Sequence, residues 1–391
     1  KCMCASGEYV KQTHPSILHA WGDSAKGGTT PDNVEGVVTI ASTHKAFAAL
    51  KEDGSVKTWG DSCCGATDPG ITSGVTKIVS AGSAFAALKF DGTVKAWGDS
   101  TEGTTPTITG KVVDLVSNTY AFVAIKDDGS VQSWGRYYNG ASYVSIADIN
   151  PTLTGVTKIA AANQAFAAIK SDGSLEAWGR SGQGGDNEPS GTGFVDVVGN
   201  IGAFAALKSD GSVKVWGSSS NGGTDPGITS GAIKLFYTGY AFAALKDDGS
   251  VKAWGGSSQG GADPGIGAGT NCQYSNGEYV SGTGCVTKIF AHKTAFAALK
   301  EDGSVTAWGQ ESKTIASGVV SITGNTGAFA ALKDDGSVEV WGSTTTGGTD
   351  PSIGAGTGCQ YSNGEYVSGT GCCLLYTSDA ADEGLGVDLG G

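Results

Sequence analysis

Charged side chains are scarce in this chain and make up 16% of its 391 residues, against about 25% in an average soluble domain. A long helical or coiled-coil protein would need many Glu and Lys residues at helical spacing, so the composition excludes that class. No run of about 18 apolar residues occurs, and the sequence therefore predicts no membrane span. The net charge of −13 argues against a protein that coats nucleic acid by neutralising phosphates.

Residue sets for catalysis or metal binding are also missing from the sequence. The 4 histidines neither recur at equivalent positions of the repeat described below nor pair at metal-ligand spacing. No Gly-x-Ser-x-Gly, phosphate-binding loop or His-Glu-x-x-His motif is found. Acidic pairs such as Asp127-Asp128 lack the alternating ligand set of a calcium loop. We therefore expect a protein that is not an enzyme and that has no cofactor and no metal site.

Glycine is abundant instead, with 65 copies, and a repeated unit accounts for much of the chain. Successive tryptophans are most often 38 residues apart, and a Phe stands twelve residues before each of the last eight tryptophans. These pairs are Phe47 and Trp59, Phe85 and Trp97, Phe122 and Trp134, Phe166 and Trp178, Phe204 and Trp216, Phe242 and Trp254, Phe296 and Trp308, and Phe329 and Trp341. We interpret them as the structural core of eight repeats.

Each repeat contains a short β-branched run, an AFAALK-like segment and an SVKTWG-like segment. Asp-Gly separates the second and third segments in all eight copies, and this dipeptide between strands indicates a hairpin. AFAALK is apolar on both faces, so both sides of its sheet must be covered. Stacked three-stranded antiparallel blades meet that need and predict an all-β fold, a β-propeller of about eight units. Seven-bladed closure plus an extra unit and a β-solenoid are the alternatives.

The segment VTKIVSAGSAFAALKFDGTVKAWGDS at 75–100 resembles the repeat of the regulator-of-chromosome-condensation propellers. Its length is nearer to the short blade of β-lactamase inhibitor protein II, in the same superfamily. The resemblance covers about residues 36–342 and implies a propeller fold. The family's His-Ser before the Ala-Leu strand is replaced by Ala84-Phe85, and its Gly-Gln-Leu-Gly loop survives only as Gly-Gly. The resemblance therefore implies the fold and not a particular activity.

Two inserts share the string CQYSNGEYVSGTGC, at 272–285 and 359–372, and we call them the cassettes. Their cysteines predict the disulfides Cys272–Cys285 and Cys359–Cys372, with reduced surface thiols as the alternative. Closing a loop of about 14 residues would stabilise the fold by roughly 3 kcal/mol in the chain-entropy model. Duplicated cysteine inserts favour an extracellular or secretory setting, and a cytoplasmic location is the alternative.

Four further cysteines stand near the beginning of the chain. The vicinal pair Cys63-Cys64 has Cys2 or Cys4 as possible disulfide partners, and the sequence does not decide the pairing. Zinc is less favoured at the cassettes, because neither contains a His or a second close Cys pair.

The domain organisation follows from the repeat and the inserts. We expect a Cys-containing partial repeat at 1–20 and a propeller at 21–358, interrupted by a cassette insert at 271–285. The second cassette occupies 359–372. Residues 373–391 resemble a translated sequencing adapter and are excluded from the fold prediction. We expect the native chain to extend beyond both ends of this segment.

These features favour a non-enzymatic binding scaffold that presents loops to a protein partner. The alternative, which the resemblance allows, is an intracellular exchange-factor-like or ubiquitin-ligase accessory propeller. Tyrosine is favoured at interfaces, and each cassette offers tyrosines beside an acidic residue. The predicted partner-binding residues are Tyr274, Glu278, Tyr279, Tyr361, Glu365 and Tyr366.

The cassettes and Cys63-Cys64 all follow a Trp strand, so we expect them at one end of the propeller. Tyr137, Tyr138 and Tyr143 lie in a longer connection. Surface packing and a sugar- or peptide-binding platform are both open interpretations for these tyrosines.

Overall fold

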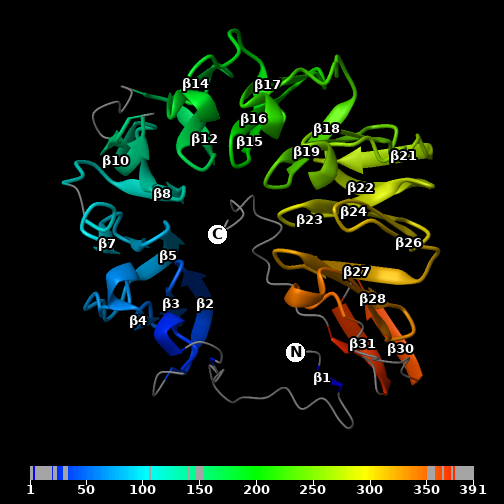
Figure 1. Cartoon of the computed structure of the whole chain (residues 1–391), viewed down its shortest axis with the longest axis horizontal. Coiled ribbons are helices and arrows are strands. Elements are labelled where there is room, and N and C mark those ends of the chain that lie inside the picture. The colour runs from blue at the N-terminus through cyan, green and yellow to red at the C-terminus, as the bar shows by residue number, and fades with distance from the viewer. Residues whose placement is uncertain are drawn as a thin grey trace. The chain divides into compact units, whose positions relative to one another are not determined.

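The computed structural model describes residues 20, 24–29, 34–104, 107–139, 141–146 and 153–349, together with the backbone of 3–4, 357–362, 365–370 and 373–374. The regular structure of these residues consists of β-strands and of 3-10 helices three residues long. No helix in these ranges is long and apolar enough to cross a membrane. The prediction of an all-β fold built from propeller blades is confirmed (Figure 1).

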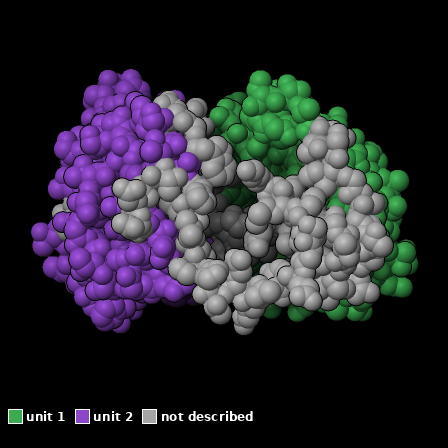
Figure 2. Space-filling model, turned by 90° about the horizontal axis from the view of Figure 1, so that it is seen from below, with its two compact units in different colours: residues 1–11, 193–387 green, residues 12–192, 388–391 purple. Residues whose placement is uncertain are grey.

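The chain divides into two compact units, which Figure 2 shows in different colours. Unit 2 comprises Gln12–Thr192 with Asp388–Gly391, and its described residues form four antiparallel sheets, here called blades 1 to 4. The strands of unit 2 are β2 (Val37–Ser42), β3 (Ala46–Lys51) and β4 (Val56–Gly60) in blade 1; β5 (Val75–Ser80), β6 (Ala84–Lys89) and β7 (Val94–Gly98) in blade 2; β8 (Val112–Ser117), β9 (Ala121–Lys126), β10 (Val131–Tyr138) and β11 (Tyr143–Ser145) in blade 3; and β12 (Val156–Ala161), β13 (Ala165–Lys170) and β14 (Leu175–Gly179) in blade 4.

Unit 1 comprises Lys1–Lys11 with Gly193–Val387 and contains blades 5 to 8. Its blades are β15 (Phe194–Gly199), β16 (Ala203–Lys208) and β17 (Val213–Gly217); β18 (Ala232–Tyr237), β19 (Ala241–Lys246) and β20 (Val251–Gly255); β23 (Val286–Ala291), β24 (Ala295–Lys300), β25 (Val305–Gly309) and β26 (Lys313–Ile315); and β27 (Val319–Gly324), β28 (Ala328–Lys333) and β29 (Val338–Gly342). Three two-stranded sheets complete the unit: β21 (Thr270–Ser275) with β22 (Glu278–Thr283), β30 (Thr357–Ser362) with β31 (Glu365–Thr370), and β1 (Met3–Cys4) with β32 (Cys373–Leu374).

The AFAALK segment is the central strand of each blade, and the Asp-Gly turn joins it to the Trp strand. In blade 1, Gly54 has a φ of +74°, a left-handed conformation that glycine adopts without a Cβ clash. The Asp53 carboxylate accepts a hydrogen bond from the Ser55 backbone N–H at 2.9 Å. Bonds from the Ser55 hydroxyl and N–H hold the pKa of the Asp53 carboxyl below its usual value. The sequence Asp-Gly-Ser therefore builds a closed turn by itself.

The two apolar faces of the central strand are covered by neighbouring blades within a unit. Ala46, Ala48 and Leu50 of blade 1 form one buried cluster with Phe85 and Trp97 of blade 2. The same arrangement, an alanine face of one blade against the Phe-Trp face of the next, recurs within both units. Small alanines let the sheets approach closely enough for the large rings to fill the space between them.

Each Phe pairs with its Trp across the two strands, as Phe85 does with Trp97. Their ring centroids are 5.3 Å apart, and the eight pairs span 5.1–5.6 Å. Phe85 is fully buried, whereas Phe47 of blade 1 is half-buried. Stacked aromatic rings at this separation contribute about 0.5–1.5 kcal/mol beyond their buried area.

The connection after the Trp strand supplies a hydrogen-bond acceptor and a packing surface for the aromatic pair of the next blade. In blade 1 it forms the 3-10 helix η2 (Ser62–Cys64), which ends at Gly65 with a φ of +105°. The Trp97 indole N–H of blade 2 donates to the Gly65 carbonyl at 3.0 Å. A Cβ at Gly65 would lie 2.6 Å from the Phe85 ring. Glycine is needed there for its backbone conformation and for the close approach of the ring.

Candidate functional site

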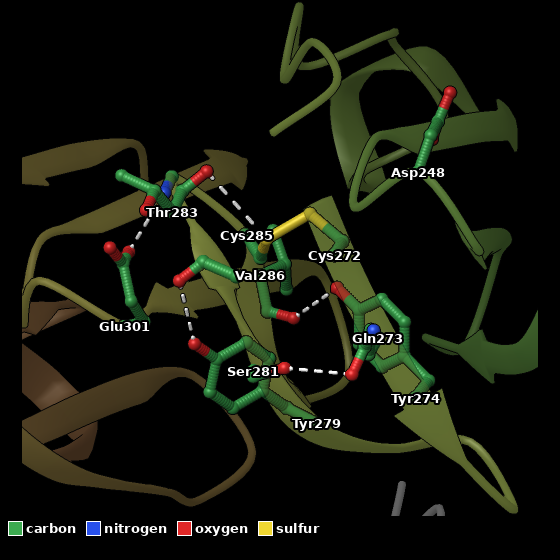
Figure 3. The surroundings of a disulfide bond; sticks show 12 residues. Asp248, Cys272, Gln273, Tyr274, Tyr279, Ser281, Thr283, Cys285, Val286 and Glu301 are labelled. Carbon is green, nitrogen blue, oxygen red and sulfur yellow. Dashed lines mark hydrogen bonds between the residues drawn. A yellow bond between two sulfur atoms is a disulfide. The ribbon is translucent and has the colours of Figure 1, made fainter. Parts of the chain in front are cut away.

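The first cassette is a β-hairpin formed by β21 and β22 (Figure 3). Asn276 and Gly277 have φ values of +51° and +77°, as a tight two-residue hairpin turn requires. The predicted disulfide between Cys272 and Cys285 is confirmed, with its Cα atoms 5.8 Å apart. Cys285 is fully buried, so the base of the hairpin belongs to the interior of the unit.

The disulfide rests against the Asp-Gly turn of blade 6. A Cβ at Gly249 would lie 2.7 Å from the Cys272 Sγ, so the sulfur occupies the space that any other residue would fill. The Gly269 N–H donates to the Asp248 carbonyl at 2.8 Å immediately before the hairpin begins. The turn therefore positions the cassette, and the disulfide holds it there.

Two predicted binding tyrosines of this cassette make hydrogen bonds within the fold. The Tyr274 hydroxyl donates to the Val286 carbonyl at 2.6 Å, and the Tyr279 hydroxyl donates to the Gly282 carbonyl at 3.0 Å. Their rings meet edge to face, with centroids 6.1 Å apart. Burial, with smaller effects of the Tyr279 ring and Asp248, raises the pKa of Tyr274 to about 12. Both tyrosines stiffen the hairpin.

Glu278 and Val280 are exposed side chains on the same face of β22. Glu278 pairs with Lys234 of β18 at 2.6 Å while its side chain stays 66% exposed. Val280 is 59% exposed and was not among the predicted binding residues. The alternation of EYVSGT in β22 is the signal that would have shown it, because neighbouring residues of a strand face opposite sides.

The second cassette has the same strand pairing as the first. Tyr361 pairs with Tyr366 and Ser362 with Glu365 across β30 and β31, as Tyr274 pairs with Tyr279 and Ser275 with Glu278 in the first. The side chains of Tyr361, Glu365 and Tyr366 and the predicted Cys359–Cys372 disulfide lie outside the described residues. Those assignments stay predictions.

The expectation that both cassettes and Cys63-Cys64 leave from one end of their blades is wrong for the first cassette and Cys63-Cys64, and for the second cassette it lies outside the described residues. In blade 6 the connection begins beside the start of β19, where the Gly256 N–H donates to the Tyr240 carbonyl. It then runs back along the Trp strand, where the Val251 N–H donates to the Ile266 carbonyl, and ends at the Asp-Gly turn. The cassette stands at this far end. Cys63-Cys64 occupies the near end of the equivalent connection in blade 1.

The longer connection of blade 3 extends β10 and adds β11. Arg136 forms an ion pair with the buried Glu102 at 3.0 Å, and its guanidinium lies 4.8 Å from the centroid of the Tyr143 ring. Arg180 lies 5.4 Å from the Tyr138 ring centroid. These are the two arginines of the chain, and both engage this insertion. Burial raises the pKa of Glu102, with the Arg136 charge acting in the opposite direction.

Tyr137 of the same insertion packs against the buried cluster beneath it, so surface packing accounts for one of the three tyrosines singled out from the sequence. Tyr143 is 49% exposed. Its ring face is covered by the Arg136 guanidinium, which leaves less of that face for a stacked sugar.

His292 of blade 7 is buried against Phe329, with ring centroids 4.3 Å apart. Its Nδ1 accepts a hydrogen bond from the Thr294 N–H at 3.2 Å, and its Nε2 lies 3.6 Å from a Glu311 carboxylate oxygen. Burial lowers the pKa of His292 to about 4. The imidazole is therefore neutral at physiological pH and acts as a packing residue.

Comparisons with known proteins return structural neighbours. No family model matches the chain, and no curated protein matches it. Yeast RCC1 (Prp20), solved with Kap60, is 14% identical, with a TM-score of 0.40 over 79% of this chain and 86% of that chain. The WD40 ectodomain of the Arabidopsis thaliana receptor kinase ACR4 is 16% identical, with a TM-score of 0.39 over 69% and 93%.

The computationally designed protein Ika8 is also similar, at 18% identity and a TM-score of 0.37 over 77% of this chain and 95% of that chain. This chain's own blades, each with a central AFAALK-like strand and a Phe-Trp pair, make it a repeat protein of the β-propeller class.

Proposed function

We propose that this chain is a non-enzymatic scaffold that presents its cassette hairpins to a protein partner. The observation that carries the proposal is the first cassette, a hairpin that packs beside β18 with part of β22 exposed and is held by the Cys272–Cys285 disulfide. Loops held on a rigid scaffold are frequent sites of recognition. A pre-ordered hairpin also loses less conformational entropy when it binds.

The recognition surface we propose is the outer side of β22, with Glu278 and Val280 as contact residues. Both side chains are exposed, and the ion pair of Glu278 with Lys234 lies at the surface. Tyr274 and Tyr279 hold the hairpin in shape, so their part in binding is indirect in this proposal. The disulfide supports a setting in the secretory pathway or outside the cell.

The experiment compares Val280→Lys with a matched exposed valine, Val113→Lys in β8, which is 50% exposed. A partner is first captured from secreted proteins of the source with the whole chain as bait, and its affinity for each variant is then measured. We expect Val280→Lys to weaken binding at least about tenfold and Val113→Lys to leave it unchanged, since exposed substitutions rarely alter stability. Equal affinities of the two variants would overturn the proposal.

A further inference from the structure

Several connections after the Trp strands begin with a similar tight turn, and the turn of blade 1 is distinguished by two adjacent cysteines. The 3-10 turn of blade 5 reads Ser-Ser-Ser-Asn-Gly at 218–222, that of blade 6 reads Gly-Ser-Ser-Gln-Gly at 256–260, and that of blade 8 reads Ser-Thr-Thr-Thr-Gly at 343–347. Blade 1 instead reads Asp-Ser-Cys-Cys-Gly at 61–65. The two cysteines are particular to blade 1 among these turns, whereas an Asp at the position of Asp61 recurs as Asp99 in blade 2. Asp61, Cys63 and Cys64 each carry an atom that can bind a metal ion.

The backbone of the turn brings these three side chains together. One carboxylate oxygen of Asp61 and the two cysteine sulfurs all lie within 4.8 Å of one another. Asp61 accepts the Cys63 N–H at 3.0 Å, and the Thr43 hydroxyl donates to the Cys64 carbonyl at 2.9 Å. The left-handed Gly65 closes the turn. The three side chains are therefore held close together before any ligand arrives, which lowers the entropy lost on binding.

The two sulfurs differ in exposure in a way that suits a bound ion. Cys64 is 6% exposed and packs among the apolar residues between blades 1 and 2, whereas Cys63 is exposed. An ion between them would have protein on one side and solvent on the other. Water is then free to complete its coordination.

A bound cation stabilises the thiolate form of both cysteines and displaces the thiol protons. Binding would replace two S–H bonds by two metal–sulfur bonds and release two protons to solvent.

We propose that Asp61, Cys63 and Cys64 form a binding site for a thiophilic d10 cation of the Zn²⁺ or Cd²⁺ class. Two sulfurs select such an ion over Mg²⁺ or Ca²⁺, which prefer all-oxygen sites. The proposal is independent of the cassettes and of the partner suggested above. The proposed role requires Cys63 and Cys64 to be free thiols, so a disulfide from either of them to another cysteine would exclude it.

The test titrates the reduced whole chain with Cd²⁺ at neutral pH and follows the thiolate-to-metal charge-transfer absorbance. The variants are Cys63→Ser, Cys64→Asn and Asp61→Ser, which place the residues of the blade 5 turn at the same positions, so the turn is expected to fold. Ser258→Ala in blade 6 is the matched control. All proteins are reduced identically, so other cysteines contribute equally except at the changed position.

We expect the unaltered chain and Ser258→Ala to bind one more Cd²⁺ than Cys63→Ser or Cys64→Asn, with about two protons released for that ion. Asp61→Ser should keep the ion with at least about tenfold lower affinity, and excess Zn²⁺ should displace Cd²⁺ at this site. Equal Cd²⁺ stoichiometry in the cysteine variants and the unaltered chain would overturn the proposal. Peptide mapping of the untreated protein that finds Cys63 joined to Cys64 or to another cysteine would also overturn it.

Discussion

Single glycines determine how closely successive blades approach. Gly222 ends the 3-10 helix η5 (Ser219–Asn221) in the connection of blade 5 with a φ of +96°, and a Cβ there would lie 2.7 Å from the Phe242 ring of blade 6. Its carbonyl accepts the Trp254 indole N–H at 3.1 Å. One residue therefore provides a left-handed turn, an acceptor and the space for a ring. Gly227 in the same connection also has a positive φ, +72°, but no atom lies within 4 Å of its Cβ position.

This difference predicts unequal costs for the same substitution. Gly222→Ala should destabilise the protein by about 3 kcal/mol, because about 1–2 kcal/mol of backbone strain adds to about 1–3 kcal/mol of overpacking. Gly227→Ala should cost only about 1 kcal/mol, from the backbone alone. Urea denaturation monitored by tryptophan fluorescence measures both. Equal losses of unfolding free energy in the two variants would show that the close approach to Phe242 adds nothing to the cost.

The Arg136–Glu102 pair gives a second prediction at this scale. Arg136→Ala would leave the Glu102 carboxylate buried without its partner and should cost about 3 kcal/mol. Adding Glu102→Gln removes the uncompensated charge and should recover part of that loss. Arg180→Ala, which removes only a stacked cation over Tyr138, serves as the control and should cost about 1 kcal/mol or less. A double variant no more stable than Arg136→Ala would argue against the buried charge as the cause.

His292 predicts how stability changes with pH. The pKa of His292 is about 4 in the fold, against 6.5 for an ordinary histidine. Between these two pH values the imidazole is protonated in the unfolded chain and neutral in the folded chain. The stability contributed by the neutral imidazole is complete above pH 6.5 and is lost as pH falls towards 4, by up to about 3 kcal/mol. His292→Asn, which introduces the residue found at the equivalent positions Asn200 and Asn325, should remove this component. Parallel stability curves for both proteins between pH 7 and about 4 would refute it.

At the scale of elements, strands and hairpins follow directly from local sequence, and connections do not. Asp-Gly between AFAALK and SVKTWG specifies a turn that its own side chains close, as Asp53 and Ser55 do. The path of the connection depends on distant backbone groups instead, such as the bond from Val251 to Ile266. Its Gly- and Pro-rich sequence has no periodicity from which that path could be read. The predicted placement of the first cassette relative to Cys63-Cys64 was wrong for this reason.

The same reasoning explains which site residues could be predicted. The Cys272–Cys285 pair was predictable, because two cysteines at the base of a hairpin sequence need only local geometry. The internal hydrogen bond of Tyr274 to Val286 was not, because it depends on how the hairpin docks on the next blade. The cluster of Asp61, Cys63 and Cys64 depends on the 3-10 turn, and the sequence of this short segment does not by itself predict that conformation.

The Cys272–Cys285 disulfide predicts how the first cassette hairpin contributes to stability. Replacing both Cys272 and Cys285 with Ala should lower the free energy of unfolding by about 3 kcal/mol, because the unfolded chain regains the freedom of a loop of about 14 residues. Limited proteolysis should then cut near Asn276-Gly277 in the variant and not in the unaltered protein. Cleavage of both proteins at the same rate would show that the hairpin is ordered without the disulfide.

At the scale of the whole molecule, each unit is stabilised by one interface repeated from blade to blade. The alanine face of one blade receives the Phe-Trp face of the next, so the core is continuous along the unit rather than central. Stability is then close to a sum of blade and interface contributions. An interior blade has two such interfaces. The Phe of the Phe-Trp pair therefore contributes more to stability where its ring is fully buried than where it is only half-buried.

Phe242 and Phe47 provide the comparison. Phe242→Ala should cost about 3–5 kcal/mol, because this ring is fully buried against blade 5. Phe47→Ala should cost clearly less, since the ring of Phe47 is half-buried. Thermal and urea unfolding of the two variants measure the difference. Equal losses would contradict a stability set by burial at the blade interfaces.

The glycine carbonyl that accepts the indole N–H of the next tryptophan keeps this hydrogen bond when sequence is added to the connection after the glycine. The Trp254 indole reaches its acceptor 32 residues back, while Trp308 reaches Gly260 at a similar hydrogen-bond distance although 48 residues separate them, because the first cassette stands between. Sequence can thus be inserted after the Gly-Gly pair and before the next first strand while the hydrogen bond from Trp to Gly is kept. The first cassette occupies that interval, and the second also follows a Gly-Gly pair, Gly347-Gly348. For a gene that grows by duplication, it is a permissive insertion point at which new surface loops can accumulate and diverge while the inherited blades remain unchanged.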